Sequence, residues 1–389
     1  MAGATLHAMR TNPVLTRMGA YAIAEIQDTA RSMREAGVPL VDFSIGDPRE
    51  PTPEFIRETL KRSVPEVSQY PTVRGLAELR EAVAGYVQRR FGVGVDPETQ
   101  VVPTRGSKEA VFSTPLAFVD RARSDGVIWP TPGYPVYERG ARIAGAIADP
   151  VTLRGDFVFR ADMPSDEAWA RAVMVWICTP HNPAGSVMTH ADIRGFYDRA
   201  VDRDAVLCSD ECYIDLYEDE APASVLQVAG DGSPNALAFF SLSKRSGMTG
   251  YRSGAIVGDP EAIRLLRELR TGTGSAPTEF GQKAAAAAWR DDDHVAERRK
   301  IFSEKRRILT AAFSELGYTI VGSRTGLYLW IRVPDDIAIS SRLLGHGVVV
   351  SPGRVFGSGG EGHVRLALVP TVEECESAVE VVQACLREN

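Results

Sequence analysis

The amino-acid sequence predicts an α/β fold, with a largely parallel sheet in a large domain and a smaller α+β domain after it. Short apolar runs alternate with helical patterns over residues 100–270, as is typical of a parallel sheet with helices on both faces. Past residue 275 this alternation gives way to longer helices and a separate group of strands. The 389 residues also exceed what one compact core usually holds, so two domains are expected.

The N-terminal segment is expected to form an arm and a helix. Residues 20–36 are compatible with a helix, and the sequence from Gly37 to Pro39 is a typical helix end. A short strand over residues 41–48 should break at Gly46, because glycine interrupts a strand. Further helices are expected at 53–64 and 76–90, with a turn-rich loop at 69–75 between them.

The central part should supply the parallel sheet. Strands are expected from residue 100 and at 126–129, 173–179, 205–209, 236–240 and 255–259, with helices at 109–119, 135–144, 189–201 and 261–270. Ligands of such sheets bind beyond the carboxyl ends of the strands. The residues that directly follow predicted strands are Gly106, Tyr134, Asn182, Asp210 and Lys244, so one site can collect them.

The C-terminal part is expected to form the α+β unit. Helices are predicted at 279–290, 293–316 and 371–387, and strands at 319–321, 326–333, 348–351 and 363–369. We therefore assign residues 41–285 to the large domain, and residues 1–40 together with 286–389 to the small one.

Composition excludes several classes of protein. The formal net charge of −7 argues against a nucleic-acid binder, which usually carries a basic excess. No apolar run approaches the ~20 residues of a membrane span, and no secretory signal is evident. The cysteine count, five, is odd and fits reduced thiols in a cytoplasmic protein. Cys208 and Cys212 lack a second ligand cluster, so no metal site is expected.

The segment from Ser241 to Gly254 contains a lysine, Lys244, among small hydroxylated residues and glycines, between two apolar runs. Burial of such a lysine disfavours its ammonium form, and a neutral lysine can form a Schiff base with an aldehyde. Ser241, Ser243 and Arg252 offer the hydroxyls and the positive charge that a phosphate needs. Aldehyde and phosphate together describe pyridoxal 5'-phosphate. A lysine ion-paired in a loop explains this segment alone equally well.

Other candidate residues are ambiguous one by one. Gly106 and Ser107 could form an anion site at a helix start, but an ordinary helix cap is the preferred interpretation of that turn alone. Tyr134 could stack on a flat ring, although such an aromatic more often belongs to the core. Asp210 is an acidic residue at a strand end, where it could pair with a pyridine nitrogen.

These pieces together resemble the fold-type I pyridoxal-phosphate enzymes, and among them the class I/II aminotransferases. The matching motifs occur in family order over nearly the whole chain. They are Tyr70–Gly75, Arg105–Glu109, Asn182–Gly185, Asp210–Tyr213, Ser241–Lys244 with Arg252, and Arg365.

The resemblance implies a role for each matching residue. Lys244, Asp210 and Tyr213 would be catalytic: Lys244 binds the cofactor aldehyde and then moves the substrate α-proton, and Asp210 pairs with the pyridinium. Arg365, Asn182 and Gly46 would contact the substrate, with Arg365 on its α-carboxylate. The cofactor would be held by Lys244, Asp210, Tyr213, Asn182, Tyr134, Gly106, Ser107, Lys108, Ser241, Ser243, Arg252 and, from the neighbouring subunit of a homodimer, Tyr70.

Within the family the chain is most similar to N-succinyldiaminopimelate aminotransferases, which implies amino transfer between glutamate and N-succinyl-2-amino-6-ketopimelate in lysine biosynthesis. The far end of such a substrate is anionic and needs a second cation, for which Arg17, Lys108 and Arg245 are candidates. Three alternatives stay open: an aspartate, alanine or aromatic aminotransferase, a pyridoxal-phosphate lyase, decarboxylase or oxidase on the same scaffold, and a non-catalytic pyridoxal-phosphate-binding regulator.

Overall fold

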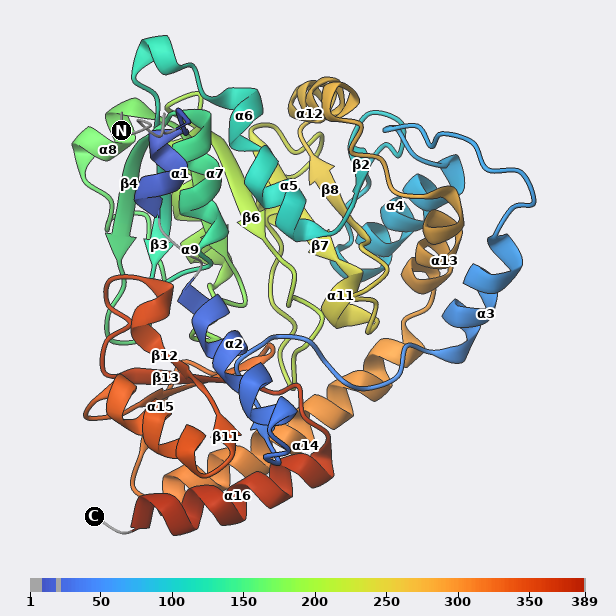
Figure 1. The fold of residues 1–389 in the computed structure, drawn as a ribbon. Helices are drawn as coiled ribbons and strands as arrows, with labels where there is room; N and C mark the ends of the chain where they lie inside the picture. The colour runs from blue at the N-terminus through green and yellow to red at the C-terminus, as the bar shows by residue number, and fades with distance from the viewer. Residues whose placement is uncertain (1–8, 19–21, 388–389) are drawn as a thin grey trace, which may run out of the picture.

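The computed structural model describes residues 9–18 and 22–387, except for the side chains of Arg17 and residues 22–27. Most of the described chain lies in two regions, a large sheet with its helices and a smaller group of strands and helices below it in Figure 1. No helix in these described ranges is both long enough and apolar enough to cross a membrane.

Within the described residues the large sheet has seven strands in the order β2-β8-β7-β6-β5-β3-β4, of which β8 alone runs antiparallel to its neighbours. This confirms the predicted largely parallel sheet. The strands are β2 (Val101–Thr104), β3 (Gly126–Thr131), β4 (Ile147–Thr152), β5 (Ala172–Cys178), β6 (Val206–Asp210), β7 (Ala236–Ser241) and β8 (Gly254–Gly258).

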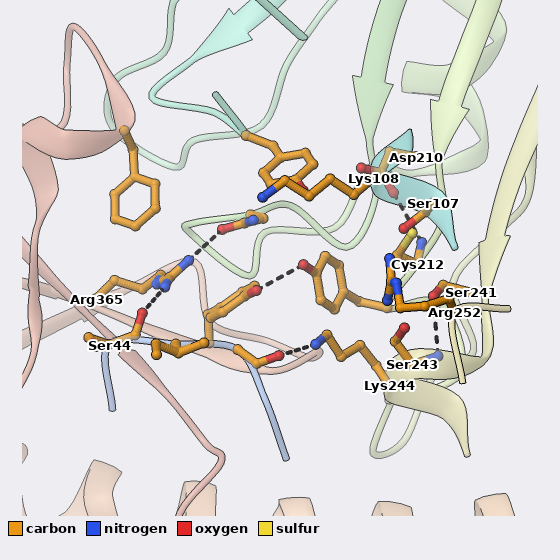
Figure 2. Close-up of a pocket in the computed structure, with 17 residues that line it drawn as sticks. Ser44, Ser107, Lys108, Asp210, Cys212, Ser241, Ser243, Lys244, Arg252 and Arg365 are labelled. Carbon is orange, nitrogen blue, oxygen red and sulfur yellow. Dashed lines mark hydrogen bonds between the residues drawn. The ribbon is translucent and has the colours of Figure 1, made fainter. Parts of the chain in front are cut away.

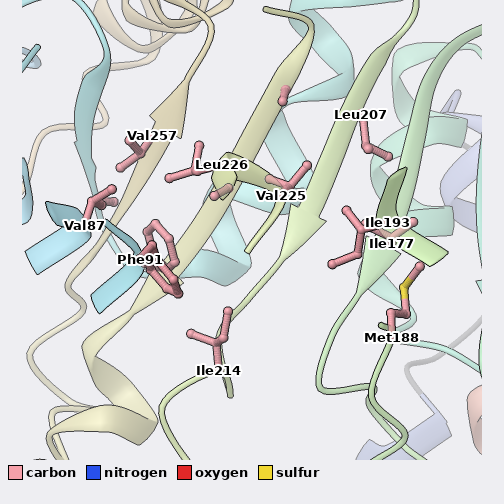
Figure 3. Close-up of a cluster of buried hydrophobic side chains, with 14 of the residues drawn as sticks. Val87, Phe91, Ile177, Met188, Ile193, Leu207, Ile214, Val225, Leu226 and Val257 are labelled. Carbon is pink, nitrogen blue, oxygen red and sulfur yellow. The ribbon is translucent and has the colours of Figure 1, made fainter. Parts of the chain in front are cut away.

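Helices cover both faces of this sheet, because successive residues of each buried strand point to opposite faces. In β7, Ala236, Ala238 and Phe240 pack on one face, whereas Leu237 and Phe239 pack on the other. The first face, part of which Figure 3 shows, is covered by α4 (Ala77–Phe91), α8 (Asp166–Arg171), α9 (His190–Val201), α10 (Val225–Ala229) and α13 (Glu279–Arg290). The second is covered by α5 (Ser107–Ser113), α6 (Pro115–Phe118), α7 (Val136–Ala144) and α12 (Pro260–Thr273).

The smaller region is built on an antiparallel sheet in the order β12-β13-β10-β9. Its strands are β9 (Thr319–Val321), β10 (Tyr328–Arg332), β12 (Ser351–Pro352) and β13 (His363–Ala367), and β1 (Val41–Asp42) pairs separately with β11 (Val348–Val349). The helices of this region are α14 (Asp293–Glu315), α15 (Asp336–Gly345) and α16 (Val372–Arg387). The other described elements are α1 (Pro13–Met18), α2 (Ala22–Glu35), α3 (Glu54–Ser63), α11 (Leu242–Arg245) and the 3₁₀ turns at 121–123 and 353–356. The domain boundaries stay a prediction.

Several predicted elements were wrong in extent. The helix expected at 109–119 is two helices, because Pro115 begins α6 directly after Thr114. The strand expected at 41–48 ends at Asp42, and the strand expected at 348–351 divides into β11 and β12. The edge strand β4 was missed, since Asp149 and Pro150 interrupt the apolar run that marks a buried strand.

Candidate active site

A cavity of about 260 Å³ lies where the carboxyl ends of the parallel strands face the smaller sheet. Figure 2 shows the side chains of both regions meeting there, with Asp210, Ser107 and Arg252 on one side and Arg365 on the other. The residues that line it are Ser44, Ile45, Gly46, Ser107, Lys108, Tyr134, Asn182, Asp210, Cys212, Tyr213, Ser241, Ser243, Lys244, Arg252, Tyr328, Phe356 and Arg365.

Lys244 projects into this cavity from α11, the short helix that follows β7. Its amine donates a hydrogen bond to the carbonyl of Gly46. Burial lowers the pKa of Lys244 to about 8, and the positive charges of Arg252 and Arg365 add to the lowering, which Asp47 opposes. The neutral amine, the form that acts as a nucleophile or a proton acceptor, is therefore far more populated near neutral pH than in an ordinary lysine, although the ammonium form still predominates at pH 7.

Asp210 is the last residue of β6 and is buried at the cavity wall. The Tyr137 hydroxyl donates to its Oδ2 at 2.7 Å, and the Cys212 N–H donates to its Oδ1 at 3.3 Å. In the described part of the chain no lysine or arginine forms an ion pair with this carboxylate. Burial raises the pKa of Asp210, so a cation placed against it would relieve the cost of its charge.

Tyr137 was not predicted from the sequence. It lies in α7, one turn after Tyr134, and its ring stacks on Trp176 with centroids 5.2 Å apart. Its position one helical turn after Tyr134 could have indicated that it lies near the site, but a tyrosine in an amphipathic helix is usually a core residue. Its hydroxyl fixes the direction of the Asp210 carboxylate.

Small hydroxyls and Arg252 line the cavity on the same side as Asp210 (Figure 2). Ser241 Oγ accepts the Ser243 N–H at 3.2 Å, and Arg252 donates from Nη1 to the Thr249 carbonyl at 2.8 Å. Gly106 has φ +83°, and a Cβ atom there would collide with the Arg252 guanidinium. The turn before Ser107 thus needs glycine for the backbone and the guanidinium to approach so closely.

Arg365 lies on β13, the strand between β12 and β10, and is buried. Its Nη1 donates to Asn182 Oδ1 at 3.0 Å and its Nη2 to the Ser44 carbonyl at 2.6 Å. Its guanidinium also lies 4.4 Å from the ring centroids of both Tyr328 and Phe356. The buried Nε has no hydrogen-bond partner among the described residues. The sequence pattern left exposure of Arg365 possible, but every residue of β13 is buried in the structure.

Tyr213 completes the site. Its hydroxyl shares a hydrogen bond of 2.8 Å with the hydroxyl of Tyr328, which comes from β10 in the smaller sheet. Tyr328 and Phe356 were also missed, because only the folded chain brings their segments beside β6.

The family model for aminotransferase class I and II matches residues 38–382. The chain belongs to this family. An LL-diaminopimelate aminotransferase of Aquifex aeolicus is 36% identical over 373 residues, covering 93% of this chain and 95% of that protein. The 4-dedimethylamino-4-oxo-anhydrotetracycline transaminase OxyQ of Streptomyces rimosus is 35% identical over 342 residues, covering 87% and 92%. A solved structure of a probable N-succinyldiaminopimelate aminotransferase of Thermus thermophilus matches with a TM-score of 0.87 at 26% identity, covering 94% and 100%.

Class I and II aminotransferases use pyridoxal phosphate, and the fold-type I architecture predicted from the sequence is confirmed. The residues of this cavity fit the cofactor. The Lys244 amine, whose pKa burial lowers, suits an aldehyde. The buried Asp210 carboxylate, which has no ion-pair partner among the described residues, suits a protonated ring nitrogen, and Arg252 with its neighbouring serines suits a phosphate.

The structure brings all the predicted site residues of this aminotransferase into the cavity lining except Gly106 and Tyr70. Gly106 lies directly behind Arg252, whereas Tyr70 is 99% exposed on the loop before α4. Among the candidates for a second cation, Lys108 lines the cavity and the side chain of Arg17 lies outside the described residues.

Arg245 was wrongly expected at the cavity. It is buried elsewhere, in ion pairs with Asp215 at 2.9 Å and with Asp292 at 2.5 Å. Successive helical residues point about 100° apart, so the side chain that follows Lys244 leaves the cavity.

Proposed function

We propose that this aminotransferase moves an amino group between a donor such as glutamate and a keto acid of the diaminopimelate class, a long chain with a carboxylate at each end. The names of its relatives support this class, since one is an LL-diaminopimelate aminotransferase and another a probable N-succinyldiaminopimelate aminotransferase. The observation that carries the proposal is that Arg365 and Lys108 line one cavity together with Lys244.

Pyridoxal phosphate supplies an electron sink that makes the substrate α-proton removable. The side chains of this enzyme then divide the remaining work. Arg365 binds the α-carboxylate with its fork, for which its unpartnered Nε is available. Lys244, whose pKa is about 8, accepts the α-proton and returns it. Asp210 keeps the ring nitrogen protonated, in an orientation that the hydrogen bond from Tyr137 holds.

The remaining site residues orient the ring. We assign Asn182 and Tyr213 to the ring oxygen and Tyr134 to a ring face, while Ser107, Ser241, Ser243 and Arg252 hold the phosphate. Tyr213 and Tyr328 both line the cavity, and Tyr328 holds Tyr213 in place by their shared hydrogen bond.

The far end of the substrate is assigned to Lys108. In Figure 2 its side chain extends from α5 across the cavity. Burial lowers the pKa of Lys108, and Arg252 and Arg139 lower it further, so its charge lies in a region of positive potential. An anionic group there would be favoured by all three cations.

A screen of keto acids and amino donors on the purified enzyme tests this function. A diaminopimelate-class keto acid should exceed oxaloacetate, pyruvate and aromatic keto acids in kcat/KM by tenfold or more. Comparing the free and the N-succinylated amino keto acids resolves the finer prediction, N-succinyl-2-amino-6-ketopimelate. Preference for a small or aromatic keto acid would overturn the assignment of this substrate class.

Replacing Lys108 with alanine should weaken only substrates with a distal carboxylate. We expect kcat/KM for such a substrate to fall by about 10- to 150-fold, the equivalent of the ~1.5–3 kcal/mol of a hydrogen bond to a charged group. Lys108→Arg keeps the charge and serves as the matched control. If activity with alanine and pyruvate falls equally, Lys108 serves the cofactor phosphate rather than the substrate.

We also propose that the active enzyme is a homodimer in which Tyr70 reaches the phosphate of the neighbouring site. Tyr70 lies on an exposed loop together with Val64 and Val67, which are 59% and 73% exposed. Apolar side chains gathered in this way favour burial against another protein surface. A second copy of the chain is the partner that the exchange of Tyr70 requires.

Mixing inactive subunits tests this exchange. Tyr70→Phe and Lys244→Ala subunits should form heterodimers in which one site carries both lesions and the other carries neither. Activity should therefore partly recover on mixing, as measured after denaturation and joint refolding. Heterodimers without recovered activity would mean that Tyr70 acts within its own chain or not at all.

The cytoplasm is the compartment we propose. All five cysteines are buried free thiols. Proteins of oxidising compartments more often pair their cysteines in disulfides, whereas cytoplasmic proteins keep them reduced.

A further inference from the structure

The three residues after Lys244 are each held by contacts with distant parts of the chain. The helix α11 has only four residues, Leu242–Arg245, and one helical turn cannot keep its direction by its own hydrogen bonds. The direction of the Lys244 side chain therefore depends on what fixes the segment behind it. For Arg245 and Ser246 that support comes from the segment joining α13 to α14, residues 288–294, which we call the α13–α14 corner.

Arg245 makes the most extensive of these contacts. Its guanidinium donates to the carbonyls of Ala288 at 2.8 Å and Asp291 at 3.2 Å, at the C-terminal end of α13. It also pairs with Asp292, and on its other side with Asp215. These carbonyls are the free acceptors that a helix end presents, and they favour a positive charge.

Arg245 also connects Lys244 with the segment that carries Tyr213. Asp215, two residues past Tyr213, accepts from Arg245 Nε at 2.9 Å and from the Tyr86 hydroxyl at 2.8 Å. The guanidinium lies 4.9 Å from the ring centroid of Tyr86 and 5.2 Å from that of Trp289. Two segments of the cavity wall are thus fastened to the same buried arginine.

Ser246 is held to the same corner by a separate contact. His294 Nδ1 lies 2.6 Å from Asp291 Oδ1, and its Nε2 lies 2.9 Å from Ser246 Oγ. Burial lowers the pKa of His294, so the neutral ring donates to Asp291 and accepts from the serine. The order Asp, His, Ser is that of a hydrolytic triad, but Ser246 has no exposed surface for a substrate to reach.

Gly247 continues the pattern. Its carbonyl accepts a hydrogen bond from the Thr52 hydroxyl at 2.6 Å, and its Cα faces the guanidinium of Arg298 in α14. Thr52 lies in the segment that begins with Gly46, whose carbonyl accepts from Lys244. The segment behind the lysine is therefore fixed by side chains from three directions.

We propose that Arg245 and Ser246 are positioning residues, through which the α13–α14 corner holds the Lys244 amine in line with the bound cofactor. The proposal rests on Lys244 being the residue that binds the cofactor, as in the proposed function. A displacement of the amine by about 1 Å is enough to cost about 10²-fold in rate. Neither residue lines the cavity, so Ser246 acts on the cofactor through the segment that carries Lys244, and Arg245 acts through that segment and the one that carries Tyr213.

Two cofactor forms separate positioning from general structural damage. Pyridoxal phosphate needs Lys244 for covalent attachment, whereas pyridoxamine phosphate binds by ring and phosphate contacts alone. In Arg245→Lys, which keeps the charge and loses the fork, the cofactor-free protein should attach pyridoxal phosphate at least tenfold more slowly. Its dissociation constant for pyridoxamine phosphate should stay within twofold of wild type.

Ser246→Ala gives a second, smaller perturbation. It should slow attachment of pyridoxal phosphate at least threefold and leave the dissociation constant for pyridoxamine phosphate unchanged. Arg264→Lys, on the exposed face of α12, is the matched control and should change neither quantity. Parallel weakening of both cofactor forms, or unchanged attachment in both variants, would overturn the positioning role. Wild-type protein that fails to attach pyridoxal phosphate at Lys244 would instead overturn the proposed function.

Discussion

Lys244→Ala should abolish multiple turnover while leaving a folded protein that still holds the cofactor by its ring and phosphate contacts. Lys244 combines cofactor attachment with proton transfer at the substrate α-carbon. Loss of a positioned acid–base alone costs about 10²–10⁴-fold in rate. Activity assays under steady-state conditions give this factor directly. The other cavity residues, Asp210 and Arg252 among them, are unchanged in the variant.

Borohydride treatment followed by peptide mass spectrometry identifies the attachment site. The wild-type protein should carry the reduced cofactor on the peptide that contains Lys244, and the variant should carry none. An unchanged reducible adduct in the variant would place attachment elsewhere. In the wild type, the rate of attachment should rise with pH and level off above about 8, because burial lowers the pKa of Lys244 to that value and the neutral amine is the nucleophile.

Arg365→Lys should raise KM for every amino acid and keto acid substrate. The substitution keeps a positive charge but removes the guanidinium fork. In the wild type that fork donates to Asn182 and to the Ser44 carbonyl, and its Nε stays available for a carboxylate. Hydrogen bonds of charged groups contribute about 1.5–3 kcal/mol, so kcat/KM should fall by about 10- to 150-fold. Steady-state kinetics with several donors measure this loss.

Arg332→Lys offers a matched control, because Arg332 is the exposed last residue of the neighbouring strand β10. It should leave KM unchanged. Arg365→Lys with wild-type KM for donors of different length would contradict an α-carboxylate site at Arg365.

The sequence was sufficient for the parts of the fold that are locally determined. Buried strands such as β5 to β7 are largely apolar, and the polar residues at or just past their ends predicted where the cavity would lie. The edge strand β4 was missed because half-exposed strands lack that pattern. Long helices such as α14 were predicted closely, since many periodic positions mark them.

Residues that act through tertiary contacts were the ones the sequence did not indicate. Tyr137 supports Asp210 from a different helix, and Tyr328 and Phe356 reach the cavity from the smaller sheet. Arg245 was misplaced because proximity to Lys244 in sequence says nothing about the direction of a side chain. Its burial against the α13–α14 corner is decided by helices distant in the chain.

The most direct test of the central assignment is the stoichiometry of one half-reaction. Enzyme loaded with pyridoxal phosphate, at a concentration comparable to that of the donor, is mixed with the best ¹⁵N-labelled amino donor from the screen. No keto acid acceptor is added. An aminotransferase centred on Lys244 should release one equivalent of keto acid per site and keep the label on the enzyme as pyridoxamine phosphate. Release of ammonia or carbon dioxide over many turnovers, with no label retained, would contradict amino transfer and indicate a lyase, decarboxylase or oxidase.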